Sequence, residues 1–215
     1  MSKPRILIAD DHKIFTEGLK RLLDEDFDIV GVVADGRQLI ASAKKLRPDA
    51  IVADISMPML NGIDAVRQIK KEQPSIKVVF LTMHPDVAYA VSAFREGASG
   101  YVLKNSAPDE LVTAIQEGLK GKTYVTPLIA GKLLRAYESG SQTQIDIDAA
   151  LNLTSRQREV LQLIAEGHTV KEIAVILNIA VKTVEYHKYR MMEDLNAKTT
   201  ADLIRFAVKQ GLVGL

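Results

Sequence analysis

The 215-residue sequence contains no cysteine and no tryptophan, and only 5% of its residues are aromatic. The absence of cysteine excludes disulfide bonds and cysteine-ligated zinc, and it is consistent with a reducing cytoplasm. No apolar stretch approaches the roughly 20 residues that a membrane-spanning helix needs. The start of the chain, Met1-Ser2-Lys3-Pro4, leads directly into an apolar strand pattern. We therefore expect a cytoplasmic protein with no membrane segment and no signal peptide.

The sequence also lacks an excess of either charge, with 28 Lys and Arg against 27 Asp and Glu. From residue 151 onward there are nine basic and seven acidic residues, which gives a net charge of +2. Any binding of nucleic acid must therefore depend on where the cations lie. A glycine-rich turn is missing after the first strand pattern, where Ala9-Asp10-Asp11-His12 stands, so a dinucleotide-binding oxidoreductase is not expected.

Up to about residue 120, strand and helix patterns alternate five times. We expect strands at about 5–9, 28–34, 49–54, 76–81 and 99–103. We expect helices at about 13–24, 36–46, 62–71, 85–96 and 107–119. This (βα)5 alternation predicts an α/β domain with a parallel sheet that is covered by helices on both faces.

Acidic residues end two of the expected strands. The apolar run at 50–53 leads into Asp54, and the run at 5–9 leads into Asp10 and Asp11. Parallel sheets place ligands at the carboxyl ends of their strands, so the three carboxylates converge if the two strands are neighbours. Like charges that close repel each other unless a cation joins them, and Mg2+ is the oxygen-seeking ion suited to this. The sequence therefore predicts that Asp54 accepts phosphate beside a Mg2+ site.

Two further side chains are expected at the same edge, because Thr82 ends one strand and Lys104 follows another. Taken singly, an acid at a strand end is usually a turn residue, Lys104 a solvated lysine and Thr82 strand filler. Their order on successive strands favours a common site. A metal and a lysine supply the charge neutralisation that phosphoryl transfer needs.

The middle of the chain is expected to be a connector. A helical pattern near 126–138 precedes Ser139-Gly140-Ser141-Gln142-Thr143-Gln144, which is typical of a flexible linker. We place the domain boundary between residues 139 and 150.

The remaining chain has helical periodicity throughout. Thr154 with Gln157, and Thr169 with Glu172, form capping-box patterns that open the first two helices. A third helix is expected from about 181 to 195, and a fourth from about 200 to 209. A short helix, a tight turn and a longer helix form the plan of a helix-turn-helix.

The third helix has an apolar side that carries Val184, Met191 and Leu195, with His187 beside it as a packed histidine. Its opposite face mixes lysine, an acid and tyrosines, which suits the major groove of DNA. A four-helix module that binds only protein remains the alternative.

Two sets of motifs resemble known families. Asp10-Asp11, Asp54-Ile55-Ser56-Met57-Pro58, Thr82, Gly97-Ala98-Ser99-Gly100-Tyr101 and Lys104 look like a bacterial receiver domain. The resemblance implies a flavodoxin-like sheet and a sensor histidine kinase as phosphate donor to Asp54. It implies Mg2+ bound by Asp11, Asp54 and the Ser56 carbonyl, with Asp10 acting largely through water. Thr82 and Lys104 would contact the phosphoryl group, and Tyr101 would be an aromatic switch.

The runs Leu153–Leu161, Ile164–Gly167, Lys171–Ala174 and Lys182–His187 are similar to the LuxR-type DNA-binding domain. The resemblance implies that base contacts come from Lys182, Glu185, Tyr186 and Tyr189. It implies that phosphate contacts come from Lys171, Thr183, Lys188 and Arg190. The fourth helix would join two copies on DNA. Ala180 stands where the family usually has serine, and Val170 where it has asparagine, so the chain departs from the family at two positions that concern phosphate anchoring and operator preference.

Joined together, the two parts resemble a NarL/FixJ-type response regulator. We expect a receiver at 1–121, a connecting helix and linker at 122–149, and the helix-turn-helix domain at 150–215. The expected partners are the sensor kinase, double-stranded promoter DNA and a second copy of the chain when active.

Two other functions are weighed against this one. An aspartate-nucleophile phosphatase typically has an Asp-x-Asp motif after its first strand. The acids after the first strand here, Asp10 and Asp11, are adjacent, so we expect no enzyme. A regulator acting only through protein contacts would show no salt-dependent DNA binding. Ser56 and His84, each two residues beyond a site residue, are expected to tune how fast the phosphoryl group is lost.

Overall fold

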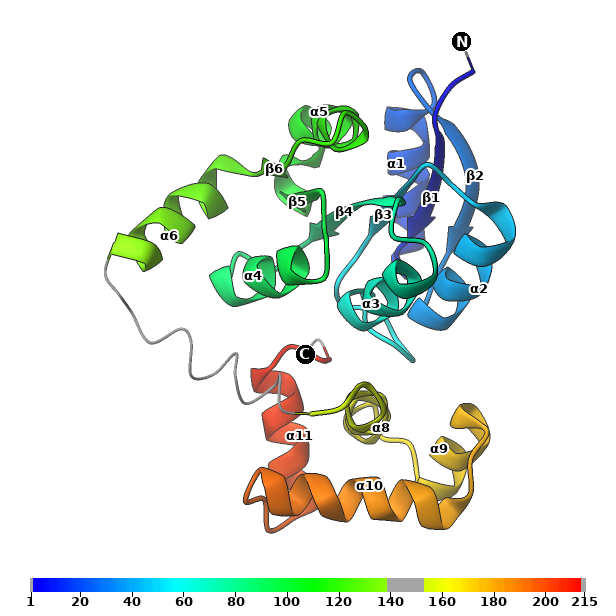
Figure 1. The fold of residues 1–215 in the computed structure, drawn as a ribbon, viewed down its shortest axis with the longest axis vertical. Helices are drawn as coiled ribbons and strands as arrows, with labels where there is room; N and C mark the ends of the chain where they lie inside the picture. Colours follow the sequence, from blue (N-terminus) through cyan, green and yellow to red (C-terminus); the bar gives the residue numbers. More distant parts are fainter. Residues whose placement is uncertain (1, 139–152, 214–215) are drawn as a thin grey trace. The chain divides into compact units, whose positions relative to one another are not determined.

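The computed structural model describes residues 2–138 and 153–213. The chain divides into two compact units, residues 1–141 and 142–215, and each is described here by itself (Figure 1). Among the described residues, no helix is long and apolar enough to cross a membrane.

The first unit is built on a parallel sheet. Its strands are β1 (Arg5–Ala9), β2 (Asp28–Val33), β3 (Ala50–Ala53), β4 (Lys77–Thr82), β5 (Gly100–Leu103) and β6 (Tyr124–Val125). They lie in the order β2-β1-β3-β4-β5-β6, and every neighbouring pair is parallel. The expected parallel α/β fold is confirmed, and the order places β1 beside β3, as convergence of the acids requires.

Helices cover both faces of this sheet (Figure 1). They are α1 (Lys13–Leu23), α2 (Gly36–Leu46), α3 (Gly62–Glu72), α4 (Val87–Arg95) and α5 (Ala107–Leu119), with a short 3-10 helix, η1 (Lys104–Ser106), before α5. Buried residues of α1 and α5 share one core, and those of α2, α3 and α4 share the other. Gly97 and Gly121 follow α4 and α5 with positive φ angles, the backbone conformation that glycine adopts without strain at helix ends.

A sixth strand and a further helix, α6 (Pro127–Glu138), extend this unit. The helix was expected, but a two-residue strand is too short to show a periodic pattern. The Thr126 amide donates to the Tyr101 carbonyl over 3.0 Å, and Ile129 is fully buried in the core that α4 shares. The packed unit therefore extends beyond residue 121, where we expected the receiver to end. The expected linker at 139–144, and the expected domain boundary between 139 and 150, lie outside the described residues.

In the part of the second unit that the structure describes, residues 153–213, there are four helices. They are α8 (Ser155–Ala165), α9 (Val170–Leu177), α10 (Val181–Asp194) and α11 (Thr200–Lys209). Both expected capping boxes are present, and Thr199 with Asp202 forms a third at the start of α11. Asn178 ends α9 in the left-handed conformation, which turns the chain tightly toward α10. The helix-turn-helix plan is confirmed.

Candidate phosphorylation site and nucleic-acid interface

The acids of β1 and β3 meet at the carboxyl edge of the sheet. Ala9 is paired with Ala53 in the ladder, and the Asp54 amide donates to the Ala9 carbonyl over 2.8 Å. One ligand atom each of Asp10, Asp11, His12 and Asp54 can be chosen so that all lie within 4.8 Å of one another. Asp10 and Asp54 are buried, whereas Asp11 is exposed.

Lys104 is the cation of this cluster. Its Nζ lies 2.7 Å from Asp10 Oδ2 and 2.7 Å from Asp54 Oδ2. The same ammonium lies 4.9 Å from the centre of the Phe15 ring on α1, a cation–π distance. β5 therefore delivers a buried lysine between the two carboxylates that β1 and β3 supply.

Burial sets the ionisation of this cluster. Burial raises the pKa of Asp54 and the charge of Asp10 raises it further, while Lys104 opposes both effects. Burial alone would lower the pKa of Lys104, but its interactions with Asp54 and Asp10 outweigh that effect and raise it. The lysine stays charged, and the carboxylate of Asp54 is ionised less readily than in water.

The donor set suits a hard divalent cation, because carboxylate oxygens are the ligands that Mg2+ prefers. The exposed carboxylate of Asp11 leaves the cluster open to solvent. His12, which we did not predict as part of the site, places its Nδ1 2.9 Å from Asp11 Oδ1 and 3.2 Å from Asp10 Oδ1. The sequence signal that could have indicated His12 as a site residue is its position directly after Asp10 and Asp11. The residues present therefore fit a Mg2+ ion.

Ser56 and His84 form a hydrogen-bonded pair beside Asp54. Ser56 Oγ lies 2.6 Å from His84 Nε2, and the Ser56 amide donates to Asp54 Oδ1 over 3.3 Å. Thr82 is fully buried, and its Oγ1 accepts a hydrogen bond from the His84 amide over 3.2 Å. The two residues expected to tune phosphoryl loss are thus joined to each other across the strand ends.

Tyr101 lies inside the unit with no exposed surface. Its hydroxyl donates to the His84 carbonyl over 2.8 Å, and burial raises its pKa well above the usual range, so it remains a neutral donor. The His84 ring also stacks on Tyr89 of α4 at a centroid distance of 4.4 Å. The β4–α4 loop therefore joins the acid cluster, the buried tyrosine and α4.

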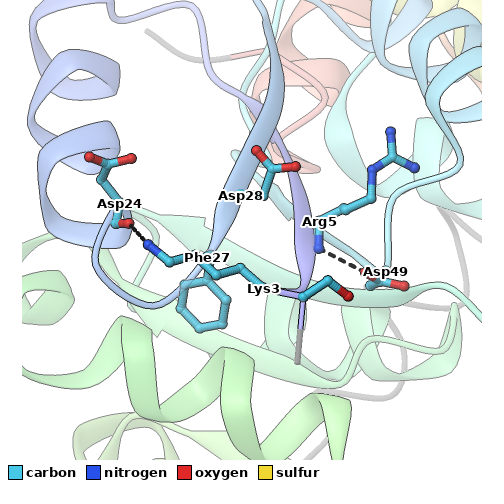
Figure 2. A pocket seen from close by; sticks show the side chains of 7 residues that line it. Lys3, Arg5, Asp24, Phe27, Asp28 and Asp49 are labelled. Carbon is cyan, nitrogen blue, oxygen red and sulfur yellow. Dashed lines mark hydrogen bonds between the residues drawn. The ribbon is translucent and has the colours of Figure 1, made fainter.

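A pocket lies at the opposite edge of the sheet, where the strands begin (Figure 2). It is lined by Ser2, Lys3, Arg5, Asp24, Phe27, Asp28 and Asp49. Lys3 Nζ donates to the Asp24 carbonyl over 2.6 Å, and the Arg5 amide donates to Asp49 Oδ2 over 2.7 Å. These groups bond to each other across the amino ends of the strands, away from Asp54.

In the second unit, α10 presents a polar face. Val184 and Met191 are fully buried, whereas Lys182, Glu185, Tyr186 and Tyr189 are all exposed. Of the expected phosphate contacts, Lys171 on α9 and Arg190 on α10 are exposed, and Thr183 and Lys188 are half-buried. The structure therefore collects the expected base-contacting side chains on one outward surface.

Three details of α10 concern its stability and charge. Ala180 is the N-cap and gives no side-chain hydrogen bond, although its backbone has the extended conformation of a capping residue. Arg190 Nη1 is paired with Glu193 Oε2 at 3.1 Å. His187 is half-buried, and its pKa is lowered by burial and by Arg156, as expected of a packed histidine.

Comparison with known families divides the chain in the same way. Residues 6–116 match the response regulator receiver domain, and residues 151–207 match the bacterial regulatory proteins of the luxR family. The chain is 35% identical over 214 residues to the oxygen regulatory protein NreC of Staphylococcus carnosus, covering 97% of this chain and 99% of that protein. It is 32% identical over 226 residues to the transcriptional regulatory protein DegU of Brevibacillus brevis, covering 99% of this chain and 96% of that protein.

Solved structures give the same result. A structure of the Salmonella typhimurium response regulator RcsB is 30% identical, covers 98% of this chain and 99% of that chain, and has a TM-score of 0.65. A complex of RcsB with DNA is also 30% identical, covers 96% of this chain and 98% of that chain, and has a TM-score of 0.59. The chain therefore belongs to the NarL/FixJ-type response regulators, a family of phosphorylation-controlled, DNA-binding transcription regulators rather than enzymes.

Proposed function

We propose that Asp54 is the phosphate acceptor of this regulator and that a sensor histidine kinase is the donor. The observation that carries this proposal is the buried arrangement of Asp10, Asp54 and Lys104, with both carboxylates 2.7 Å from one ammonium. An Asp54 oxygen attacks the phosphorus of a phosphohistidine, and the bond between phosphorus and the imidazole nitrogen breaks. The products are an aspartyl phosphate and a free histidine.

Lys104 then pairs with the phosphoryl oxygens in place of the Asp54 carboxylate. Asp11, Asp54 and the Ser56 carbonyl would hold Mg2+, with Asp10 acting largely through water. The ion supplies charge neutralisation at the phosphoryl oxygens when bound. The Thr82 hydroxyl, which now accepts from the His84 amide, would exchange that bond for one to a phosphoryl oxygen.

A labelling experiment tests the acceptor. The full chain is incubated with acetyl phosphate and Mg2+, and the hydroxylamine-labile acyl phosphate is measured. We expect Asp54→Asn to abolish the label. Asp28→Asn, an exposed acid at the opposite edge of the sheet, serves as the control and keeps it. A full label in Asp54→Asn would overturn the assignment.

For the second unit, we propose that α10 enters the major groove of promoter DNA. Lys182, Glu185, Tyr186 and Tyr189 face the bases, while Lys171, Thr183, Lys188 and Arg190 meet phosphates. The support is the exposed polar face of α10 opposite its buried Val184 and Met191. Phosphorylation promotes pairing of two copies, which then bind paired half-sites, and the protein acts in the cytoplasm.

The salt dependence of DNA binding tests this interface. Each lost phosphate contact lowers the slope of log K against log salt by about 0.9. We expect Lys171→Ala to lower the slope by about that amount and to weaken all sequences alike. Lys209→Ala, at the end of α11, is the control and leaves the slope unchanged. Equal slopes in the wild type and Lys171→Ala would remove Lys171 from the interface.

A further inference from the structure

The acids of α10 differ in their surroundings. Glu193 is paired with Arg190 at 3.1 Å, and Asp194 Oδ2 accepts a hydrogen bond from Gln157 Nε2 over 3.4 Å. Glu185 is exposed, and among the described residues it makes no ion pair and no hydrogen bond. Glu185 is therefore the acid of this helix whose carboxylate is available to a ligand.

Glu185 also lies at the centre of the outward face of α10. Residues three and four apart are neighbours on a helix, so Lys182, Glu185, Tyr186 and Tyr189 form one continuous surface. Tyr186 and Tyr189 are 61% and 65% exposed, and fully buried Val184 and Met191 lie on the other side. Any nucleic acid that contacts the tyrosines and Lys182 must therefore also meet the carboxylate of Glu185.

A carboxylate on such a surface is unfavourable unless it finds a donor. It is repelled by DNA phosphates, and it loses its water when the helix enters the groove. In the major groove guanine presents only acceptors and thymine presents an acceptor and a methyl group. The donors there are the amino groups at cytosine N4 and adenine N6.

Cytosine and adenine differ in what lies beside the amino group. Adenine carries the N7 acceptor next to N6, so a carboxylate that approaches N6 brings its second oxygen against a lone pair. Cytosine has no such acceptor on its major-groove edge, and acidic side chains accept from its N4. We propose that Glu185 accepts a hydrogen bond from a cytosine N4 amino group and thereby fixes one base in each half-site bound by this protein.

This inference depends on the proposed entry of α10 into the major groove. It predicts that guanine or thymine at that position leaves the carboxylate desolvated and unpaired, and that adenine sets its N7 lone pair against the second carboxylate oxygen. A good base contact of this kind discriminates by about tenfold to a hundredfold against the wrong base. Because the contact is to a base, it changes sequence preference and not the salt slope.

The proposal is tested by letting the phosphorylated full chain select bound sequences from a pool of random duplexes. Duplexes that differ at single positions are then compared by competition. We expect the wild type to require cytosine at one position of each half-site. Glu185→Gln should change that preference to adenine, since an amide bonds both N6 and N7 of adenine. The control is Glu193→Gln, which removes the same charge from the same helix and should keep cytosine.

The outcomes separate the two proposals. Identical base preferences in the wild type and Glu185→Gln, with DNA still bound, would overturn the role of Glu185 alone. Failure of the wild type to enrich any sequence would overturn the proposed DNA interface. Because Glu185 is exposed and makes no ion pair or hydrogen bond among the described residues, its substitution is expected to leave folding intact, and an unchanged thermal transition checks this.

Discussion

The burial of Asp54 lowers the stability of the fold at neutral pH. Burial raises its pKa above the ordinary value of 3.8, so its ionised form is disfavoured in the folded state. The favourable contribution of the protonated form is fully present below that ordinary value and is lost as pH rises through the raised pKa. At neutral pH the ionised group therefore weakens the fold, and a bound cation offsets the effect.

Asp54→Asn should accordingly remove one source of the pH dependence of folding stability. In the absence of Mg2+, we expect the variant to gain thermal stability relative to the wild type as pH rises from about 4 to about 7. Circular dichroism melts of both full-length proteins measure the difference, and saturating Mg2+ should reduce it at pH 7. A difference that stays constant across this range would show that burial does not govern the ionisation of Asp54.

Ser56 and His84 also act at the scale of single side chains. Their 2.6 Å hydrogen bond lies beside Asp54, whose Oδ1 accepts from the Ser56 amide, and we propose that the pair hinders the approach of water to an aspartyl phosphate. We expect the double variant Ser56→Ala, His84→Ala to lose its phosphoryl group several-fold faster in a chase after acetyl phosphate labelling. An unchanged decay rate would remove both residues from this role.

At the scale of elements, the β6–α6 extension is a structural part of the first unit. Ile129 of α6 is 0% exposed, whereas Leu128 next to it is 51% exposed. Truncating a buried isoleucine costs about 2–5 kcal/mol, so Ile129→Ala should lower the thermal transition of that unit clearly. Leu128→Ala is the matched control and should change stability by less than about 0.5 kcal/mol. Equal effects of the two changes would mean that α6 does not pack as described.

At the start of α10, a single substitution should increase stability instead of lowering it. Ala180 has the φ and ψ of an N-cap, −66° and 145°, but no side-chain acceptor. Ala180→Ser should supply one and stabilise the second unit by about 1 kcal/mol, measured by urea unfolding. Ala180→Val, which has no acceptor either, is the control. A serine variant no more stable than the valine variant would contradict this account of the helix start.

The elements differ in how far the sequence determines them. Capping boxes at Thr154 and Thr169 are local signals, and both predicted helix starts were correct. β6 has two residues, and its pairing with β5 depends on tertiary contact, so no periodic pattern could indicate it. His12 was missed for a related reason, because its closeness to the acid pair follows from the turn after β1 rather than from residue type.

At the scale of the whole molecule, the chain joins a receiver unit to a helix-turn-helix unit. The order of site residues along the strands predicted the receiver, because parallel strands bring their carboxyl ends to one edge. Individual hydrogen bonds could not be predicted from the sequence. The bond from the Tyr101 hydroxyl to the His84 carbonyl, for example, depends on the conformation of the β4–α4 loop.

The central claim is that a phosphoryl group on Asp54 controls DNA binding by the second unit. The most direct measurement is the affinity of the full-length protein for a promoter fragment, at fixed salt and with Mg2+, before and after addition of beryllofluoride. We predict tighter binding by the wild type after the addition and no change for Asp54→Asn. An equal affinity in the wild type with and without beryllofluoride, or an equal gain in Asp54→Asn, would contradict the account.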